Sequence, residues 1–292
     1  MGTPAAPTAP AVRRYLAEFL ADPRVVPLPR PLWLPLLHCV VLPLRARQSA
    51  HKYAQIWTPE GSPLAVYTAR MAQRLAEHLQ LPVAYAMRYG EPAIARALAR
   101  LADPVVVPLY PQYAASTTGS VLDVLPRGAA VVRGFHDHPA YIAALATSVR
   151  QHWAERGRAP MLVMSFHGLP QRSAGNYERE CRTTATLLAR ALALRDAQWR
   201  LTFQSRFGYA RWLEPDTERT LIELARDGGL RRVDVICPGF MADCLETLEE
   251  IGIRARAKFR EAGGESLELV PCLNDSPEWI AALAEISARA SP

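Results

Sequence analysis

The sequence contains no apolar run long enough to cross a membrane. Its most apolar stretch, residues 32–44, is shorter than the ~18 residues that a spanning helix needs, and Pro35, His38 and Pro43 interrupt it. The opening MGTPAAPTAP lacks a basic segment followed by an apolar core, so no secretory leader is expected. We expect a cytoplasmic chain whose only membrane contact is peripheral, at the inner face, with residues 32–44 as the edge that touches it.

Cysteine is scarce, and its spacing excludes the common cysteine-based frameworks. The five cysteines are odd in number, widely separated and include no C-x-x-C pair. This pattern predicts reduced thiols rather than disulfides, and it matches no zinc or cluster motif. We expect the cysteines to act as small buried apolar residues.

Runs of basic residues interleaved with aromatics are also missing. The net charge of +6 is therefore a mild and scattered excess, which disfavours nucleic acid and favours acidic small molecules as partners. At 292 residues with half of them hydrophobic, the chain suits two packed lobes.

Short β-rich runs alternate with apolar residues at helical spacing along the whole chain. Such alternation is typical of α/β proteins with parallel sheets and helices on both faces. A boundary between two sheets fits near residues 137–139. The predicted strands are 83–87, 105–110, 130–135, 161–166, 200–204, 233–237 and 267–270, and the predicted helices are 63–79, 92–101, 140–155, 177–194, 216–226, 242–251 and 277–290.

The stretch MSFHGLP places an imidazole at the end of a predicted strand. His167 is followed at once by the turn residues Gly168 and Pro170, and ligands of open α/β sheets bind beyond such strand ends. The position fits a proton acceptor or metal ligand, and equally a histidine that caps the strand by bonding a nearby carbonyl. Ser165, on the same pleat face, would orient the ring or fill the sheet.

The segment MADCLETLEEIG carries a row of carboxylates. On an α-helix, Asp243, Glu246 and Glu250 fall on one side and the apolar residues on the other. A solvated acidic face is the commonest explanation of such a row. The functional alternative is a ladder of ligands that collects a metal cation.

Several motifs together make the chain resemble the ferrochelatases, the terminal enzymes of haem synthesis. The motifs occur in the family's order over nearly the whole chain: the opening GTP, EGSP, AMRYGEP, PQYAASTTGS, SFHGLP, SRFG…WLEPDT and CPGFMADCLETLEEIG. The combination of the SFHGLP motif with the last segment is the most specific of these.

The resemblance implies a fold and a reaction. The fold would be two Rossmann-like lobes, each a parallel sheet flanked by helices, with a porphyrin cleft between them. One lobe would cover residues 1–136 with the returning C-terminal residues 275–292, and the other residues 137–274. The reaction would be insertion of Fe²⁺ into protoporphyrin IX, with iron as substrate, by a monomer or weak homodimer.

The resemblance also implies roles for individual residues. His167 would accept the pyrrole protons, because its unperturbed pKa lies near the operating pH, and Glu246 would be its acidic partner. The cleft would bind a buckled macrocycle best and so expose its nitrogen lone pairs. The implied metal ligands are His167, Glu246, Glu250 and Asp243; Arg88, Tyr89, Trp212 and Phe240 would line the porphyrin, and Arg45 and Ser62 would bind its propionates.

Two features depart from the family pattern. Family members carry an apolar strand just before the GTP, whereas here Met1 directly precedes Gly2, so we expect the first strand of the first sheet to be missing. Cluster-bearing relatives have a cysteine at the position of Ala115 and a cysteine-rich tail. This chain has neither, so no iron–sulfur cluster and no permanently bound cofactor are expected.

Two other hypotheses stay open at this point. One is a related chelatase that uses coproporphyrin or inserts cobalt. The other is a catalytically silent tetrapyrrole-binding module, which the presence of both His167 and Glu246 argues against, since a carrier needs no base facing an acid.

Overall fold

A four-stranded parallel sheet forms the centre of the C-terminal half of the computed structural model, which describes residues 1–208 and 210–288. The strand order is β2-β1-β3-β4, so the chain crosses over between neighbours, as parallel pairing requires. Strands β1, β2 and β3 are mostly buried, as expected when helices cover both faces, whereas in the edge strand β4 only Leu267 is buried. The strands are β1 (Leu162–His167), β2 (Trp199–Gln204), β3 (Arg232–Ile236) and β4 (Ser266–Leu269).

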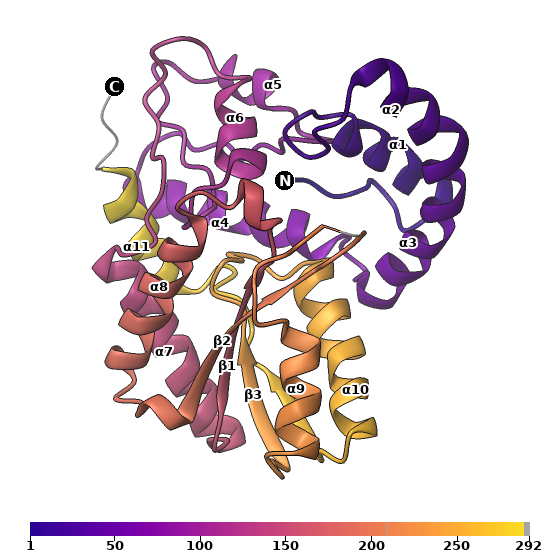
Figure 1. Ribbon diagram of the computed structural model, residues 1–292. Coiled ribbons are helices and arrows are strands. Elements are labelled where there is room, and N and C mark those ends of the chain that lie inside the picture. Colours follow the sequence, from indigo (N-terminus) through magenta and orange to yellow (C-terminus); the bar gives the residue numbers. More distant parts are fainter. Residues whose placement is uncertain (209, 289–292) are drawn as a thin grey trace.

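Helices pack on both faces of this sheet (Figure 1). On one face, α7 (Pro139–Arg156), α8 (Tyr177–Ala191) and α11 (Pro277–Ser287) share a core with Met164 and Phe166 of β1. On the other, α9 (Thr217–Arg226) and α10 (Arg256–Glu261) enclose Val163 and Val233. The α/β class and the strands and helices predicted for this half are confirmed to within a few residues, except for the predicted helix 242–251; residues 289 and 290 of the last one lie outside the described residues.

The N-terminal half is mainly helical. Helix α4 has the predicted bounds and packs against α11, which joins the two halves through one continuous core. Three further α-helices precede it, in residues for which we predicted no helix and, at 32–44, an apolar edge. The helical segments are α1 (Ala9–Leu20), α2 (Arg30–Leu36), the π-helix η1 (Leu37–Val41), α3 (Leu42–Ile56), α4 (Pro63–Leu79), α5 (Ile94–Leu98), the π-helix η2 (Ala115–Gly119) and α6 (Ser120–Leu122).

The three strands predicted in this half are wrong for the described residues, where only isolated bridges form. Gly2 pairs with Tyr89, and Val106 with Val131, both in parallel, for one residue each. Proline explains part of this, since Pro104, Pro108 and Pro111 interrupt one segment and donate no ladder hydrogen bonds. The parallel direction that we predicted is kept without a continuous ladder.

No helix among the described residues is both long enough and apolar enough to cross a membrane.

Candidate functional site

His167 ends β1 with one ring nitrogen already engaged. Its Nδ1 lies 2.7 Å from the carbonyl oxygen of Gly168, and a carbonyl only accepts hydrogen bonds, so Nδ1 carries the proton in the neutral ring. The lone pair is therefore on Nε2, where it can take a proton or bind a metal. His167 thus bonds a backbone carbonyl through Nδ1, as a strand cap does. Its Nε2 still has the lone pair that a base or a metal ligand needs.

Phe240 and Tyr177 lie next to His167. The ring of Phe240 lies 6.4 Å from the imidazole, centroid to centroid. Tyr177 of α8 donates a hydrogen bond of 2.9 Å to the backbone carbonyl of His167. The structure therefore brings together His167 and Phe240, two of the residues that the sequence predicted for the site.

Gln204 links the end of β1 to the segment that carries Glu246. Gln204 is paired in register with His167 across β1 and β2, and its side-chain amide donates a hydrogen bond of 2.7 Å to the carbonyl of Glu246. The side chain of Glu246 is half-buried. Burial and, next, the nearby Glu246 carboxylate raise the pKa of the Cys244 thiol well above its usual range, so this thiol stays neutral.

The helix that carries Glu246 is a π-helix, η5 (Leu245–Ala255), and not the α-helix that we predicted. Its i→i+5 bonding puts more residues in each turn, so residues four apart nearly align. The side chains along one side of η5 are then those of Glu246, Glu250 and Arg254. The predicted row of carboxylates therefore ends in the guanidinium of Arg254. Asp243 lies before the helix.

Asp243 is buried and has its oxygens engaged. One oxygen accepts from the hydroxyl of Thr247 at 3.0 Å, and the other from the amide of Asn274 at 2.7 Å. These bonds fasten the start of η5 to the loop after β4. Among residues 1–208 and 210–288, no three His, Cys, Asp or Glu side chains are grouped closely enough to hold a metal ion.

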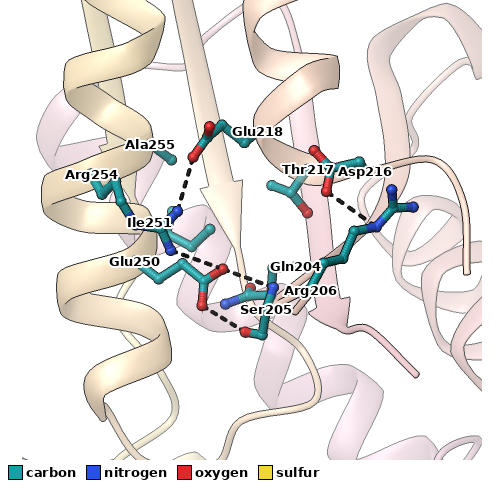
Figure 2. Close-up of a pocket in the computed structure, with 10 residues that line it drawn as sticks. All are labelled: Gln204, Ser205, Arg206, Asp216, Thr217, Glu218, Glu250, Ile251, Arg254 and Ala255. Atoms are coloured by element: carbon teal, nitrogen blue, oxygen red, sulfur yellow. Dashed lines mark hydrogen bonds and ion pairs between the residues drawn. The ribbon is translucent and has the colours of Figure 1, made fainter. Parts of the chain in front are cut away.

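Glu250 lines a cavity of about 360 Å³ between β2, α9 and η5 (Figure 2). Both of its oxygens accept from Ser205, at 2.7 Å from the backbone N–H and 2.6 Å from the hydroxyl. Arg254 pairs with it at 3.2 Å and with Glu218 at 3.0 Å. The lining includes neither His167 nor Glu246, so this charged cavity is separate from the imidazole.

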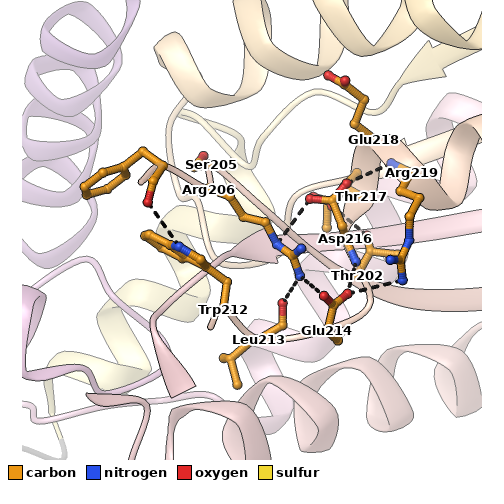
Figure 3. A network of polar contacts seen from close by, with 12 residues as sticks. Thr202, Ser205, Arg206, Trp212, Leu213, Glu214, Asp216, Thr217, Glu218 and Arg219 are labelled. Carbon is orange, nitrogen blue, oxygen red and sulfur yellow. Dashed lines mark hydrogen bonds and ion pairs between the residues drawn. The ribbon is translucent and has the colours of Figure 1, made fainter. Parts of the chain in front are cut away.

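The loop after β2 carries Trp212 and contacts the N-terminal half. Trp212 packs on Phe207 with ring centroids 5.0 Å apart and donates to its carbonyl at 3.1 Å. The guanidinium of Arg45, from α3, lies 5.6 Å from the Phe207 ring centroid. Arg206 fixes the loop by pairing with Glu214 at 2.8 Å and Asp216 at 3.3 Å (Figure 3). Arg45 and Trp212 therefore both contact Phe207, and these three side chains form one wall.

Arg88, Tyr89 and Ser62 have partners inside the N-terminal half. Arg88 pairs with Asp22 at 2.9 Å, and the hydroxyl of Tyr89 donates to the same carboxylate at 2.7 Å. Tyr89 is only 1% exposed. Ser62 is buried and lies 2.7 Å, oxygen to oxygen, from the hydroxyl of Thr3. These three residues, which we predicted to contact the porphyrin, thus bond to other residues of the N-terminal half.

Sequence reasoning missed Gln204, Asp22 and Arg206. The position of Gln204 at the end of a predicted strand, level with His167, was a usable signal. Arg206 stands in the SRFG motif after a predicted strand, but the motif gave no role for it. Asp22 carried no signal, since most of its partners lie far along the chain. The cysteines are buried as expected except Cys39, which is exposed.

Comparison with known proteins gives one family for the whole chain. The family model described as ferrochelatase matches residues 1–291. The chain is 54% identical to the ferrochelatase of Polaromonas sp. strain JS666, over 99% of this chain and 84% of the relative. It is 48% identical to that of Xylella fastidiosa strain M23, over 100% of this chain and 96% of the relative.

Solved structures with much lower identity share the fold. SirB from Bacillus subtilis, solved with Fe³⁺, matches with a TM-score of 0.53 at 17% identity, over 77% of this chain and 87% of SirB. CbiX, described as the terminal enzyme of sirohaem biosynthesis in denitrifying bacteria, matches with a TM-score of 0.52 at 19% identity, over 79% of this chain and 95% of CbiX. At these identities the likeness shows a chelatase-like fold.

Proposed function

The chain belongs to the ferrochelatase family, and from this premise we propose which of its residues carry out the reaction. The reaction is the insertion of iron into protoporphyrin in haem synthesis, with Fe²⁺ as substrate. It replaces the two pyrrole N–H protons by the metal, so each turnover needs a base that removes two protons. The proposal assigns that task to His167.

The observation that carries the proposal is the hydrogen bond from Nδ1 of His167 to Gly168. It holds the ring in the tautomer with its lone pair on Nε2. Nε2 takes one pyrrole proton, releases it and then takes the second. A base fixed at a strand end needs no reorientation before the proton transfer.

Glu246 is proposed as the acidic partner that binds the incoming Fe²⁺ or relays the protons. Carboxylate oxygen and imidazole nitrogen are both suitable ligands for a divalent first-row metal. Glu250 and Asp243 have their oxygens engaged by Ser205, Thr247 and Asn274, so the proposal gives them a structural role.

The porphyrin is proposed to lie between two parts of the chain, residues 1–136 with 275–292 and residues 137–274. Phe240 beside His167, and the wall formed by Arg45, Phe207 and Trp212, would contact the macrocycle. Arg45 comes from the first part and Phe207 from the second, which supports a shared cleft. A wall whose side chains contact one another favours one bound geometry of the ring.

We also propose peripheral contact with the inner face of a membrane through an apolar face that runs from the bend before α2 along α2 and η1 to the start of α3. This apolar face consists of Leu28, Leu32, Leu36, Val40 and Leu44, spaced four residues apart. Leu32 is 74% and Leu44 69% exposed. An apolar stripe of this kind on a helical segment is typical of interfacial contact.

The test measures metal insertion anaerobically, by the absorbance of protoporphyrin IX mixed with Fe²⁺ or Zn²⁺. His167→Ala should lower the rate by a factor of about 10²–10⁴, the usual contribution of a general base. Glu246→Gln should slow insertion while porphyrin binding stays near normal. The matched control is His78→Ala, which removes an exposed histidine at the end of α4. Equal rates for His167→Ala and the wild type would remove the histidine from the mechanism.

A further inference from the structure

Gln204 is bonded to both segments that carry the proposed catalytic pair. It is the last residue of β2, 2% exposed, and lies opposite His167 in the strand register. Its backbone carbonyl accepts a hydrogen bond of 2.7 Å from the N–H of Gly168, the residue after His167. Its main chain therefore fixes the point at which the imidazole leaves the sheet.

The side chain of Gln204 fixes the other partner. Its Nε2 donates to the carbonyl of Glu246 at 2.7 Å, and its Oε1 accepts from the hydroxyl of Ser165 at 2.7 Å and the thiol of Cys237 at 3.6 Å. A flipped amide would direct its oxygen at the Glu246 carbonyl, so only one orientation is compatible with these partners. The first turn of η5 is thus held by a locked amide.

The bond to Glu246 matters because Glu246 lies in the first turn of a π-helix. A π-helix is rare and is found mostly as short segments at functional sites. The Cys237 thiol beside the amide is kept neutral, because burial raises its pKa well above the usual range. The amide therefore has neutral hydrogen-bonding partners, whose pattern stays constant over the pH range of the reaction.

From these contacts we infer that Gln204 is a positioning residue, which sets the separation between the imidazole of His167 and the carboxylate of Glu246. The inference rests on the proposed function of that pair. Gln204 touches neither substrate nor metal in this role. It acts through the backbone on each side, and a displacement of the pair by about 1 Å is enough to lower the rate about 10²-fold.

The experiment compares two substitutions at this position. Gln204→Leu removes both polar groups and should lower kcat for metal insertion by about 10–100-fold, with porphyrin affinity changed less than about twofold, since the amide does not contact the ring. Gln204→Glu keeps the acceptor for Ser165 and regains a donor toward Glu246 only when its carboxyl is protonated. Its rate relative to the wild type should therefore rise as the pH falls, because a buried carboxyl has a raised pKa.

The matched control is Thr202→Val, which removes another buried polar group from β2, a hydroxyl hydrogen-bonded to Thr217 at 2.9 Å. Its thermal stability should fall by an amount similar to that of Gln204→Leu, with kcat unchanged. A Gln204→Leu enzyme with the kcat of Thr202→Val, or a Gln204→Glu ratio that does not depend on pH, would overturn the positioning role. Full activity of His167→Ala would instead refute the proposed function itself, so the two failures are distinguishable.

Discussion

Both carboxylate oxygens of Glu250 are hydrogen-bonded to Ser205, one by its backbone N–H and one by its hydroxyl. Ser205 has a φ of +65°, in the left-handed region that favours glycine. It directly follows Gln204, so the strained turn lies next to the bond that holds Glu246. The left-handed conformation costs a non-glycine residue about 1–2 kcal/mol. The two hydrogen bonds to Glu250 therefore stabilise a conformation of Ser205 that the backbone alone disfavours.

Replacing Glu250 by leucine should destabilise the protein more than replacing it by glutamine. Leucine leaves the half-buried donors of Ser205 without acceptors, which costs about 1 kcal/mol, whereas glutamine retains one acceptor. Urea unfolding of the two variants measures the difference. In a Ser205→Gly background, where the turn is no longer strained, the loss from Glu250→Leu should shrink. Wild-type stability of Glu250→Leu with weakened metal affinity would show that Glu250 is a ligand instead.

Asp22 gives a prediction on acid stability. Burial alone would raise the pKa of its carboxyl, but the hydroxyls of Ser120 and Tyr89, the N–H of Arg24 and the charge of Arg88 together lower it. Because the folded pKa is lowered, the stabilisation is fully present above the usual carboxyl pKa of about 3.9 and is lost as the pH falls through the folded value.

The Asp22→Asn variant should therefore be less stable than the wild type at neutral pH by about 1–3 kcal/mol, the usual size of hydrogen bonds to a charged group. The difference in unfolding free energy should shrink as the pH falls below about 3.9. Denaturant unfolding of both proteins across this range measures it. Asp123→Asn, which alters an exposed ion pair with Arg24, is the control and should change stability little. A gap between wild type and Asp22→Asn that stays constant with pH would contradict the lowered pKa.

The sequence predicted the sheet that carries the site, and most of the helices around it, better than the helices of the N-terminal half. The strand ending at His167 was predictable because an apolar run stops at Gly168 and Pro170, both strong turn signals. Helices α2 and α3 were not, because Pro35 and Pro43 usually break helices. Here the π-helical turn Leu37–Val41 lies between them and lets the helical path continue.

Of the site itself, the sequence predicted the residues but not their partners. Glu246 and Glu250 were identified as one acidic row, yet η5 winds as a π-helix and is hydrogen-bonded by residues from elsewhere, among them Gln204 and Ser205. A local pattern cannot report such contacts. The same holds for Arg88 and Tyr89, whose shared partner Asp22 is remote in sequence.

The apolar face is tested by vesicle binding. The double variant Leu32→Asp/Leu44→Asp should bind lipid vesicles at least about tenfold more weakly, since burial of each leucine contributes about 1.5–3 kcal/mol. Insertion rates with detergent-dispersed porphyrin should not change, because neither leucine belongs to the proposed cleft. Leu81→Asp, at another leucine that is 59% exposed, is the control. Unchanged cosedimentation of the double variant would exclude this face as the membrane contact.

Arg254 ends the row of Glu246 and Glu250, and its guanidinium is the cation that several carboxylates share. It pairs with Glu218 at 3.0 Å, Glu250 at 3.2 Å and Glu249 at 3.9 Å. Glu249 also has Lys52 at 3.3 Å, so removing Arg254 leaves mainly Glu218 and Glu250 without a cation. Each Glu250 oxygen accepts one bond from Ser205 and keeps a second lone pair. Without Arg254, these lone pairs and Glu218, beside a cavity of about 360 Å³, suit a hydrated divalent ion.

Arg254→Gln should therefore create a second Mn²⁺ site that the wild type lacks, measured as an added stoichiometric component in Mn²⁺ titrations followed by electron paramagnetic resonance. Arg254→Lys, which keeps the charge, should not create it. Arg231→Gln, which opens the exposed pair with Glu265 at the opposite end of β3, should also leave the stoichiometry unchanged. A tighter site should slow insertion at low iron by holding the metal away from His167. Identical Mn²⁺ binding by Arg254→Gln and the wild type would exclude a metal site at Glu218 and Glu250.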